Sequence, residues 1–468
     1  FEKAREEVVE DNRQLFEACD PRPVDSDPRP NIERVQFGGT AEQIAEAKKL
    51  VETLSKVLCE DLTEAMEESR APLFRIDLKE GFRERRRTRP LRRRSQEEEK
   101  AITDFIAVMV RAGMIKPCNV PQAASLVLVR QKSKICICVD FRELNEGTIV
   151  DQYPQARSDE ILGSLHGCKY FSTLDATSGY WQVGIEKASQ YLTAFKTKLG
   201  TYMWTRLPFG LVNAPAHYNR WMEKVLAGLP VFRYVDDIII ATETWEEHIK
   251  VLRQVLERCE EHGVKIKASK CHIGKQEVEI LGHTVSREGI RPTAKKVAAI
   301  LDMKAPSNAK ELKTFMGCVS FYRRYCMNLS ATTYEMRQLL KKGAKYNWTA
   351  ATQKEFEDTK KLLTSKEIML AHPDPNKPFY IHVDASTKGI GACLLQEVEG
   401  PKGMKTLKVI EYFSQSLKGG EIHYGITALE GLGIVKAVER WHPYVYGGDL
   451  TVVTDHKPLL SMRKSSNP

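Results

Sequence analysis

Two adjacent carboxylates, Asp236 and Asp237, lie inside an otherwise apolar run that extends from Tyr234 to Ile240. A charged side chain in such a run is costly unless it is paired or bound to a metal ion. Because successive residues of a strand point to opposite faces, both carboxylates can serve one site only if they lie at a hairpin turn. We therefore predict a turn at this pair, with Asp236 as the main metal ligand and Asp237 as the secondary one.

A third carboxylate, Asp175, follows another apolar stretch at 171–174. Three carboxylates on neighbouring strands form the ligand set that a site with two Mg²⁺ ions needs for phosphoryl transfer. For the Asp236–Asp237 pair alone, the alternative interpretation is a solvated hairpin tip with two ordinary aspartates.

A second set of carboxylates lies closer to the C-terminal end. Asp384 ends one expected strand, Glu430 lies in a helix-like run, and Asp455 ends another apolar strand. Taken singly, each residue is most simply interpreted as a surface carboxylate.

The elements that must position these residues are readable from periodicity and turn signals. Helical spacing of apolar residues predicts a helix that begins after Thr244, with Glu247 completing a capping box. Other expected strands and helices occupy Ala124–Arg130, Ile135–Phe141, Cys168–Ala176, a strand–turn–strand at Tyr234–Thr242, short strands at Val278–Val285, a Lys-rich helical stretch at Thr293–Leu363, and a strand-rich unit from Pro378 onward.

Composition sets outer limits on the class of protein. The 468 residues are enough for about three domains, and 42% of them are hydrophobic, which is typical of a globular chain. No run of apolar residues is long enough to span a membrane. Eleven cysteines without disulfide-scaffold spacing favour reduced thiols and an intracellular protein. The net charge of +9 is compatible with a polyanionic partner, and a start at Phe1 suggests a fragment or a processed product.

Six sequence blocks occur in a fixed order: VDFRELN, FSTLDATSGYWQVGI, TAFKT, RLPFGLVNAPAHYNRWMEKVL, YVDDIIIA and LGHTVSREGI. This ordered set resembles the reverse transcriptases of gypsy-type LTR retrotransposons, from about Arg75 to the end. The resemblance implies an α+β fold: a right-hand polymerase with fingers, ferredoxin-like palm and thumb, followed by an RNase H-like α/β domain. We expect an N-terminal extension at 1–70, fingers and palm at 71–290, thumb and connection at 291–370, and the RNase H-like domain at 371–468.

The resemblance also assigns roles to single residues around the polymerase site. Asp175, Asp236 and Asp237 match the metal-binding triad, for Mg²⁺ or alternatively Mn²⁺. Tyr180 matches the aromatic residue beneath the incoming sugar, although a buried core ring is the other interpretation. Further matches are Phe209 and Gly210 in the nucleotide pocket, Lys270 as a proton donor to pyrophosphate or a solvated lysine, and Leu281, Gly282 and His283 as the primer grip.

The fingers depart from the family pattern. The family has a Trp-Arg pair before its Asp-Phe-Arg motif, whereas the matching positions here are Ile135 and Cys136. The cation that contacts the triphosphate must then come from another residue, and the candidates are Arg130, Lys132, Lys134 and Arg142. Further along, Arg323 and Arg324 are candidates for phosphate contacts.

Asp384, Glu430 and Asp455 match, in order, the metal ligands of the RNase H domain that follows these polymerases. The family has a fourth carboxylate well downstream, which is missing before the sequence ends at Pro468, and Ala428 stands where the family has Glu. We therefore expect a C-terminally truncated domain that cleaves RNA–DNA hybrids poorly.

These observations lead to one leading hypothesis: a Mg²⁺-dependent RNA-directed DNA polymerase with an RNase H-like domain. The implied partners are an RNA or DNA template, a primer, an RNA–DNA hybrid and dNTPs, without a membrane; the sequence leaves the oligomeric state open. The resemblance implies an intracellular location, in a cytoplasmic particle or alternatively in the nucleus. Two other hypotheses stay open, a pararetroviral polymerase and a decayed or domesticated element that binds nucleic acid without catalysis.

Overall fold

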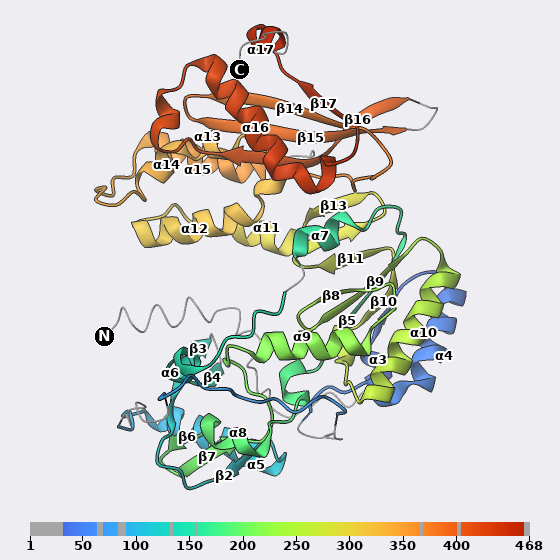
Figure 1. The fold of residues 1–468 in the computed structure, drawn as a ribbon, viewed down its shortest axis with the longest axis vertical. Helices are drawn as coiled ribbons and strands as arrows, with labels where there is room; N and C mark the ends of the chain where they lie inside the picture. Colours follow the sequence, from blue (N-terminus) through green and yellow to red (C-terminus); the bar gives the residue numbers. More distant parts are fainter. Residues whose placement is uncertain are drawn as a thin grey trace. The chain divides into compact units, whose positions relative to one another are not determined.

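The structure, a computed structural model, describes residues 31–62, 69–82, 90–131, 134–154, 157–364, 368–399 and 404–462. The chain divides into two compact units, and neither is continuous in sequence (Figure 1). The first unit combines Phe1–Ser158 with Lys169–Gln276, and the second combines Asp159–Cys168 with Glu277–Pro468. Several sheets and many helices alternate along the chain, which confirms the predicted α+β class.

The first unit contains two five-stranded sheets. The sheet that carries the polymerase carboxylates has the order β1-β10-β5-β9-β8. Its strands are β1 (Gln36–Phe37), β10 (His272–Lys275), β5 (Tyr170–Asp175), β9 (Asp237–Thr242) and β8 (Phe232–Tyr234). The other sheet has the order β2-β7-β6-β3-β4, with β2 at Ile115–Pro117, β7 at Gly200–Trp204, β6 at Phe195–Thr197, β3 at Ala124–Gln131 and β4 at Lys134–Val139.

Helices bury the apolar side chains of the first sheet. The helix α10 (Trp245–His262) follows the predicted N-cap Thr244, whose side chain accepts a hydrogen bond from the Glu247 amide. The reciprocal bond from the Glu247 side chain is not formed, so the predicted capping box is only half present. The buried face of α10 includes Ile249, Leu252, Val255 and Leu256, which confirms the expected apolar face. Contacts join α10 to β9, to β5 and to α4 (Ala41–Thr53), and α9 (Ala214–Val225) also packs on α10. The same core includes Ile238 and Ile240, two of the three isoleucines that follow the Asp236–Asp237 pair.

The second unit begins with a three-stranded sheet, β11 (Glu277–Ile280), β12 (His283–Ser286) and β13 (Gly289–Pro292). The expected helical stretch consists of several short helices rather than one long one. They are α11 (Ala294–Leu301), α12 (Ala309–Phe321), η6 (Arg323–Tyr325), α13 (Leu329–Thr332), α14 (Tyr334–Gln338) and α15 (Ala350–Leu362).

A four-stranded sheet with the order β16-β15-β14-β17 completes the second unit. Its strands are β14 (Phe379–Ser386), β15 (Gly389–Glu399), β16 (Lys405–Gln415) and β17 (Leu450–Val453). The long helix α16 (Ile426–Val445) packs on β14 and β15 and buries Trp441 completely. A Cβ added at Gly433 would lie 2.6 Å from Val383 Cγ1, so the helix approaches the sheet closely there. The chain continues into α17 (Lys457–Met462).

An ion-pair network ties the segment Asp159–Cys168 into the second unit. Asp159 lies 3.5 Å from an Arg324 guanidinium nitrogen and 3.7 Å from one of Arg440, and both arginines also pair with the buried Glu411. The side chain of Arg324 is only 10% exposed. Its expected role as a phosphate contact is therefore wrong, because a buried and paired guanidinium cannot reach a polyanion.

In the part of the chain that the structure describes, no helix combines the length and the apolar character that crossing a membrane requires.

Candidate active sites

The three polymerase carboxylates lie at one end of the β5–β9 pair. In the antiparallel register, Asp175 is the direct partner of Asp237. Tyr234 also pairs with Asp237, so Val235 and Asp236 form the two-residue turn of the β8–β9 hairpin. The turn predicted for the Asp236–Asp237 pair is therefore present, and it allows both side chains to serve one site.

The turn has an unfavourable backbone conformation. Val235 has φ of 53°, a left-handed conformation that a β-branched residue rarely adopts. Two-residue hairpin turns usually place Gly, Asn or Asp in such positions. Strain of this kind is commonly found at functional sites, where the surrounding structure holds it in place.

The electrostatics of this site favour binding of a cation. Burial, together with Asp175 and Asp237, raises the pKa of Asp236 to about 7, and Lys270 partly opposes the shift. Burial and Asp175 raise the pKa of Asp237 to about 6. Oδ1 of Asp236 is buried and has no hydrogen-bond partner among the described residues. A buried carboxylate oxygen without a partner is energetically costly, and a divalent cation would remove that cost.

Lys270 is the one predicted residue that contacts a triad carboxylate directly. Its ammonium Nζ lies 2.9 Å from Oδ2 of Asp175, which compensates part of the negative charge. Among the described residues, no group of three or more His, Cys, Asp and Glu side chains is already assembled in the geometry of a metal site. The oxygen donor set still fits Mg²⁺ or Mn²⁺, since both ions prefer carboxylate ligands.

Gly179, which the sequence analysis did not single out, provides the space for Asp236. A Cβ added at Gly179 would lie 2.6 Å from Oδ1 of Asp236 and 2.7 Å from Cζ of Tyr218. Its neighbour Tyr180 is 5% exposed, with its ring centroid 5.1 Å from that of Phe209 and 5.4 Å from that of Tyr218. Tyr180 therefore packs as a core residue, and its burial, together with the charge of nearby Asp236, raises the tyrosine pKa.

The loop that follows Phe209 is held by Asn145, another residue that the sequence analysis missed. Asn145 lies in α6 (Arg142–Gly147); its Nδ2 donates to the Gly210 carbonyl at 2.8 Å, and its Oδ1 accepts from the Val212 amide at 2.9 Å. Gly210 has φ of 94°, so this position favours glycine. The only sequence signal for Asn145 was its place at the end of the VDFRELN block.

Two of the four candidate cations of the fingers, Arg130 and Arg142, form ion pairs with nearby carboxylates. Arg142 forms a two-pronged ion pair with Asp140, at 2.9 and 2.8 Å, which raises the arginine pKa. Arg130 lies 3.2 Å from Glu97. Lys132 lies outside the described residues, and only the backbone of Lys134 is described, opposite Gln131 in the β3–β4 pair. Cys136, which replaces the expected arginine, is buried.

Of the three predicted primer-grip residues, two form a tight turn and the third is buried. Leu281 and Gly282 connect β11 to β12 with φ of 51° and 82°. The His283 ring stacks on Phe321 at 5.0 Å, and its Nδ1 lies 2.7 Å from the Tyr325 hydroxyl. Burial lowers the pKa of His283 to about 4. A direct primer contact by the His283 side chain is therefore incompatible with this structure, and only the turn itself is presented at the surface.

The second carboxylate set gathers at the ends of two adjacent parallel strands. His382 of β14 pairs with Val453 of β17, and Asp384 and Asp455 each follow two residues later, so both lie at the same level. Oε1 of Glu430, on α16, accepts a hydrogen bond from the Ala385 amide at 3.3 Å.

Glu430 is largely buried, and its Oε2 has no hydrogen-bond partner among the described residues. Burial raises the pKa of Glu430, and the charges of Asp455 and Asp384 add to the shift. With the unpartnered Oε2 of Glu430 and two neighbouring carboxylates, this set offers oxygen donors that fit a divalent cation.

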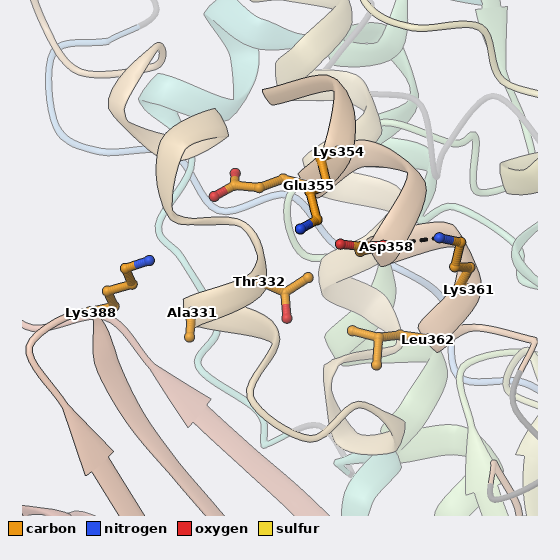
Figure 2. A pocket seen from close by; sticks show the side chains of 8 residues that line it. All are labelled: Ala331, Thr332, Lys354, Glu355, Asp358, Lys361, Leu362 and Lys388. Atoms are coloured by element: carbon orange, nitrogen blue, oxygen red, sulfur yellow. Dashed lines mark hydrogen bonds and ion pairs between the residues drawn. The ribbon is translucent and has the colours of Figure 1, made fainter. Parts of the chain in front are cut away.

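A cavity of about 510 Å³, with several charged side chains in its lining, lies beside the β14–β15 turn (Figure 2). It is lined by Ala331 and Thr332 of α13, by Lys388 of the turn, and by residues of α15. Figure 2 shows Lys361 paired with Asp358, at 3.1 Å. Lys354 and Lys388 also line the cavity, and neither forms an ion pair within the described part of the chain.

Comparisons with known proteins agree with this arrangement. Residues 130–285 match the family described as reverse transcriptase (RNA-dependent DNA polymerase), and residues 348–452 match the RNase H-like domain found in reverse transcriptase. Similar curated proteins include the retrovirus-related Pol polyproteins from the Drosophila melanogaster transposons 297 (32% identical, 80% of this chain, 35% of the relative) and opus (36% identical, 75% of this chain, 36% of the relative). The chain thus spans about a third of the length of these relatives.

The fold also resembles a solved structure. The foamy viral protease–reverse transcriptase in complex with RNA/DNA hybrid aligns with a TM-score of 0.79 at 21% identity, over 98% of this chain and 61% of that one. At this level of identity, the similarity establishes a shared fold.

Proposed function

We propose that this chain is the RNA-directed DNA polymerase of an LTR retrotransposon, with an RNase H-like domain after the polymerase region. Residues 130–285 and 348–452 match the two corresponding families, and retrotransposon Pol polyproteins are similar over 75–80% of the chain. The observation that carries the proposal is the convergence of Asp175, Asp236 and Asp237 at one end of the β5–β9 pair. Their raised pKa values and the unpaired Oδ1 of Asp236 support a cation site there.

The proposed reaction is attack of the primer 3′-oxygen on the α-phosphorus of a dNTP. The new bond joins that oxygen to phosphorus, the bond to the bridging oxygen breaks, and pyrophosphate leaves. Asp175, Asp236 and Asp237 would hold Mg²⁺, or alternatively Mn²⁺. Such ions, when bound, lower the pKa of the attacking hydroxyl and neutralise the leaving group. Lys270, whose ammonium group is placed at Asp175, is a proposed proton donor to the leaving pyrophosphate.

Substrate selection would depend on the aromatic residues beside the triad. Tyr180 packs against Phe209, and the Gly210 loop after it is fixed by Asn145. We propose that the flat face of Tyr180 leaves no space for a 2′-hydroxyl and so favours deoxynucleotides. The paired arginines of the fingers, Arg130 and Arg142, would have to exchange their carboxylate partners for a triphosphate.

The second carboxylate set supports a second proposed activity, hydrolysis of the RNA strand in an RNA–DNA hybrid. Asp384, Glu430 and Asp455 would hold the metal ion for it, and Lys354 and Lys388 would contact the phosphate backbone through the adjacent cavity. The related fold was solved with an RNA/DNA hybrid, which supports a template, a primer and their hybrid as partners of this chain.

Primer extension on poly(rA)/oligo(dT) with Mg²⁺ tests the polymerase proposal. We expect extension by the native chain, and loss of at least a hundredfold in rate in Asp175→Asn and in Asp236→Asn, with template binding retained. Asp104→Asn, an exposed change on α5 (Gln96–Arg111), is the matched control and should extend normally. Template binding without any extension by the native chain would favour the decayed or domesticated element instead.

A further inference from the structure

A side chain from the connecting region reaches the second carboxylate set. Asn328, which lies between η6 and α13, donates a hydrogen bond from Nδ2 to Oδ2 of Asp384 at 3.4 Å. Asp384 stays exposed despite this contact, so the amide supports the carboxylate without covering it. We propose that Asn328 is a positioning residue that orients Asp384 for a divalent cation, an inference that rests on the proposed hydrolysis of the hybrid.

The side chain of Asn328 is not used for the local role that its position suggests. Asn328 precedes α13 at the N-cap, where an asparagine usually accepts a hydrogen bond from a backbone amide of the first turn. Here its side chain forms no such bond, and its backbone has φ of 54° and ψ of 26°. The backbone carbonyl instead accepts from the amides of Ala331 and Thr332, both at 3.0 Å. The amide group is thereby free to reach across to the sheet.

The strand opposite Asp384 is shaped to receive this amide. Gly391 of β15 is the register partner of Asp384 in the β14–β15 pair. A Cβ added at Gly391 would lie 1.6 Å from Oδ1 of Asn328, so only glycine fits at position 391. The Asn328 amide therefore lies across the two paired strands, with its oxygen over Gly391 and its nitrogen on Asp384.

A buried contact two residues further along fixes the position of this segment. The amide of Ser330 donates to Oγ of Ser414 on β16 at 2.7 Å, and both serines are 1% exposed. The location of Asn328 thus depends on the packing of α13 against the sheet. A donor held in this way restricts the rotation of the Asp384 carboxylate and leaves Oδ1 available to a cation.

Binding of Mn²⁺ alone, followed by electron paramagnetic resonance of the free ion, tests the role of Asn328 without relying on cleavage. All variants carry Asp175→Asn and Asp236→Asn, so that the polymerase site does not contribute. Asn328→Gly removes the amide and tolerates the left-handed backbone. Ser172→Ala is the control for loss of stability, because Ser172 is buried and hydrogen-bonded to the Gly274 amide in the first unit, and its loss leaves Asn328 and its supports intact. Thermal melting monitors the fold of each variant.

We expect Asn328→Gly to weaken Mn²⁺ binding about tenfold. Ser172→Ala should lower the melting temperature and leave Mn²⁺ affinity within about twofold of the background. Unchanged or tighter binding in Asn328→Gly overturns the positioning role, and tighter binding would show that the amide competes with the ion. Mn²⁺ binding that Asp384→Asn does not reduce would overturn the proposed metal site itself, and the role of Asn328 with it.

Discussion

The Asp236 carboxylate is buried, so its negative charge is unfavourable when no cation is bound. Its pKa is raised from the ordinary 3.8 to about 7, so the folded protein binds this proton more tightly than the unfolded chain. Stability that depends on Asp236 is therefore fully present below about pH 4 and is lost as the pH rises to about 7. In EDTA, we expect the melting temperature of the native chain to fall across this interval.

Comparison with Asp236→Asn isolates this contribution from those of other groups. His283 acts in the opposite direction, because its pKa is lowered to about 4 by burial. At pH 8 in EDTA, Asp236→Asn should melt at a higher temperature than the native chain, and added Mg²⁺ should raise the melting temperature of the native chain more than that of the variant. Equal melting temperatures of the two proteins at pH 8 would contradict the electrostatic strain assigned to Asp236.

Tyr180 combines a core position with a proposed role in sugar selection. Its burial and two ring contacts favour the core interpretation that the sequence left open, so its loss should destabilise the fold. Tyr180→Ala should cost about 3–5 kcal/mol in the free energy of unfolding, as for other large aromatic truncations. It should also admit ribonucleotides, measured as the ratio of kcat/KM for dNTP and rNTP.

Tyr180→Phe serves as the control, because it keeps the ring and its packing. We expect it to retain both stability and discrimination against ribonucleotides. A destabilised Tyr180→Ala with unchanged discrimination would leave Tyr180 with a packing role only.

At the scale of elements, η3 (Gly179–Gln182) can approach the β8–β9 hairpin closely because Gly179 has no side chain. Gly179→Ala would push Asp236 or Tyr218 out of place. We expect destabilisation of about 1–3 kcal/mol, and primer extension reduced about a hundredfold, as for other misplacements of a catalytic group by an ångström.

Gly317→Ala is the matched control for this substitution. Gly317 lies in α12, and an added Cβ would have no neighbour within 4 Å. Replacement in the helix should stabilise the protein by about 0.5–1 kcal/mol and leave extension unchanged. Normal extension in Gly179→Ala would show that the hairpin can shift without moving the carboxylate.

Local patterns predicted the hairpin at Asp236 and the buried face of α10, because both depend on residues that are neighbours in sequence. They did not predict Asn145 or Asn328, whose partners lie 65 and 56 residues away. The burial of His283 was not predictable for a related reason: His283, Thr284 and Val285 are all buried, so β12 shows no alternation between an inner and an outer face. The left-handed conformation of Val235 was not predictable either, because two-residue turns usually place Gly, Asn or Asp in such positions. Departures from local preference of this kind are expected at functional sites.

At the scale of the whole molecule, the net charge of +9 makes nucleic-acid binding sensitive to salt. If Lys354 and Lys388 contact phosphates, Lys354→Ala/Lys388→Ala should reduce the slope of log Kd against log salt concentration by about two. Fluorescence anisotropy with a labelled RNA–DNA hybrid provides this slope. Lys361→Ala, whose ammonium is already paired with Asp358, should change it less. An unchanged slope in the double variant would exclude the cavity as a phosphate contact.

The crossing of the chain between its two units has a consequence for synthesis on the ribosome. Asp159 needs Arg324 and Arg440 as partners, and Arg440 follows it by 281 positions. At about 5–20 residues per second, Arg440 is translated roughly 15–60 s after Asp159. Until residue 277 is translated, the decapeptide Asp159–Cys168 has none of its partners from the second unit, and its ion-pair network stays incomplete until Arg440 is made, although the strands on both sides of it belong to the first unit. The nascent polymerase region therefore carries an unfinished loop through much of its own translation, which makes this loop a natural contact for chaperones.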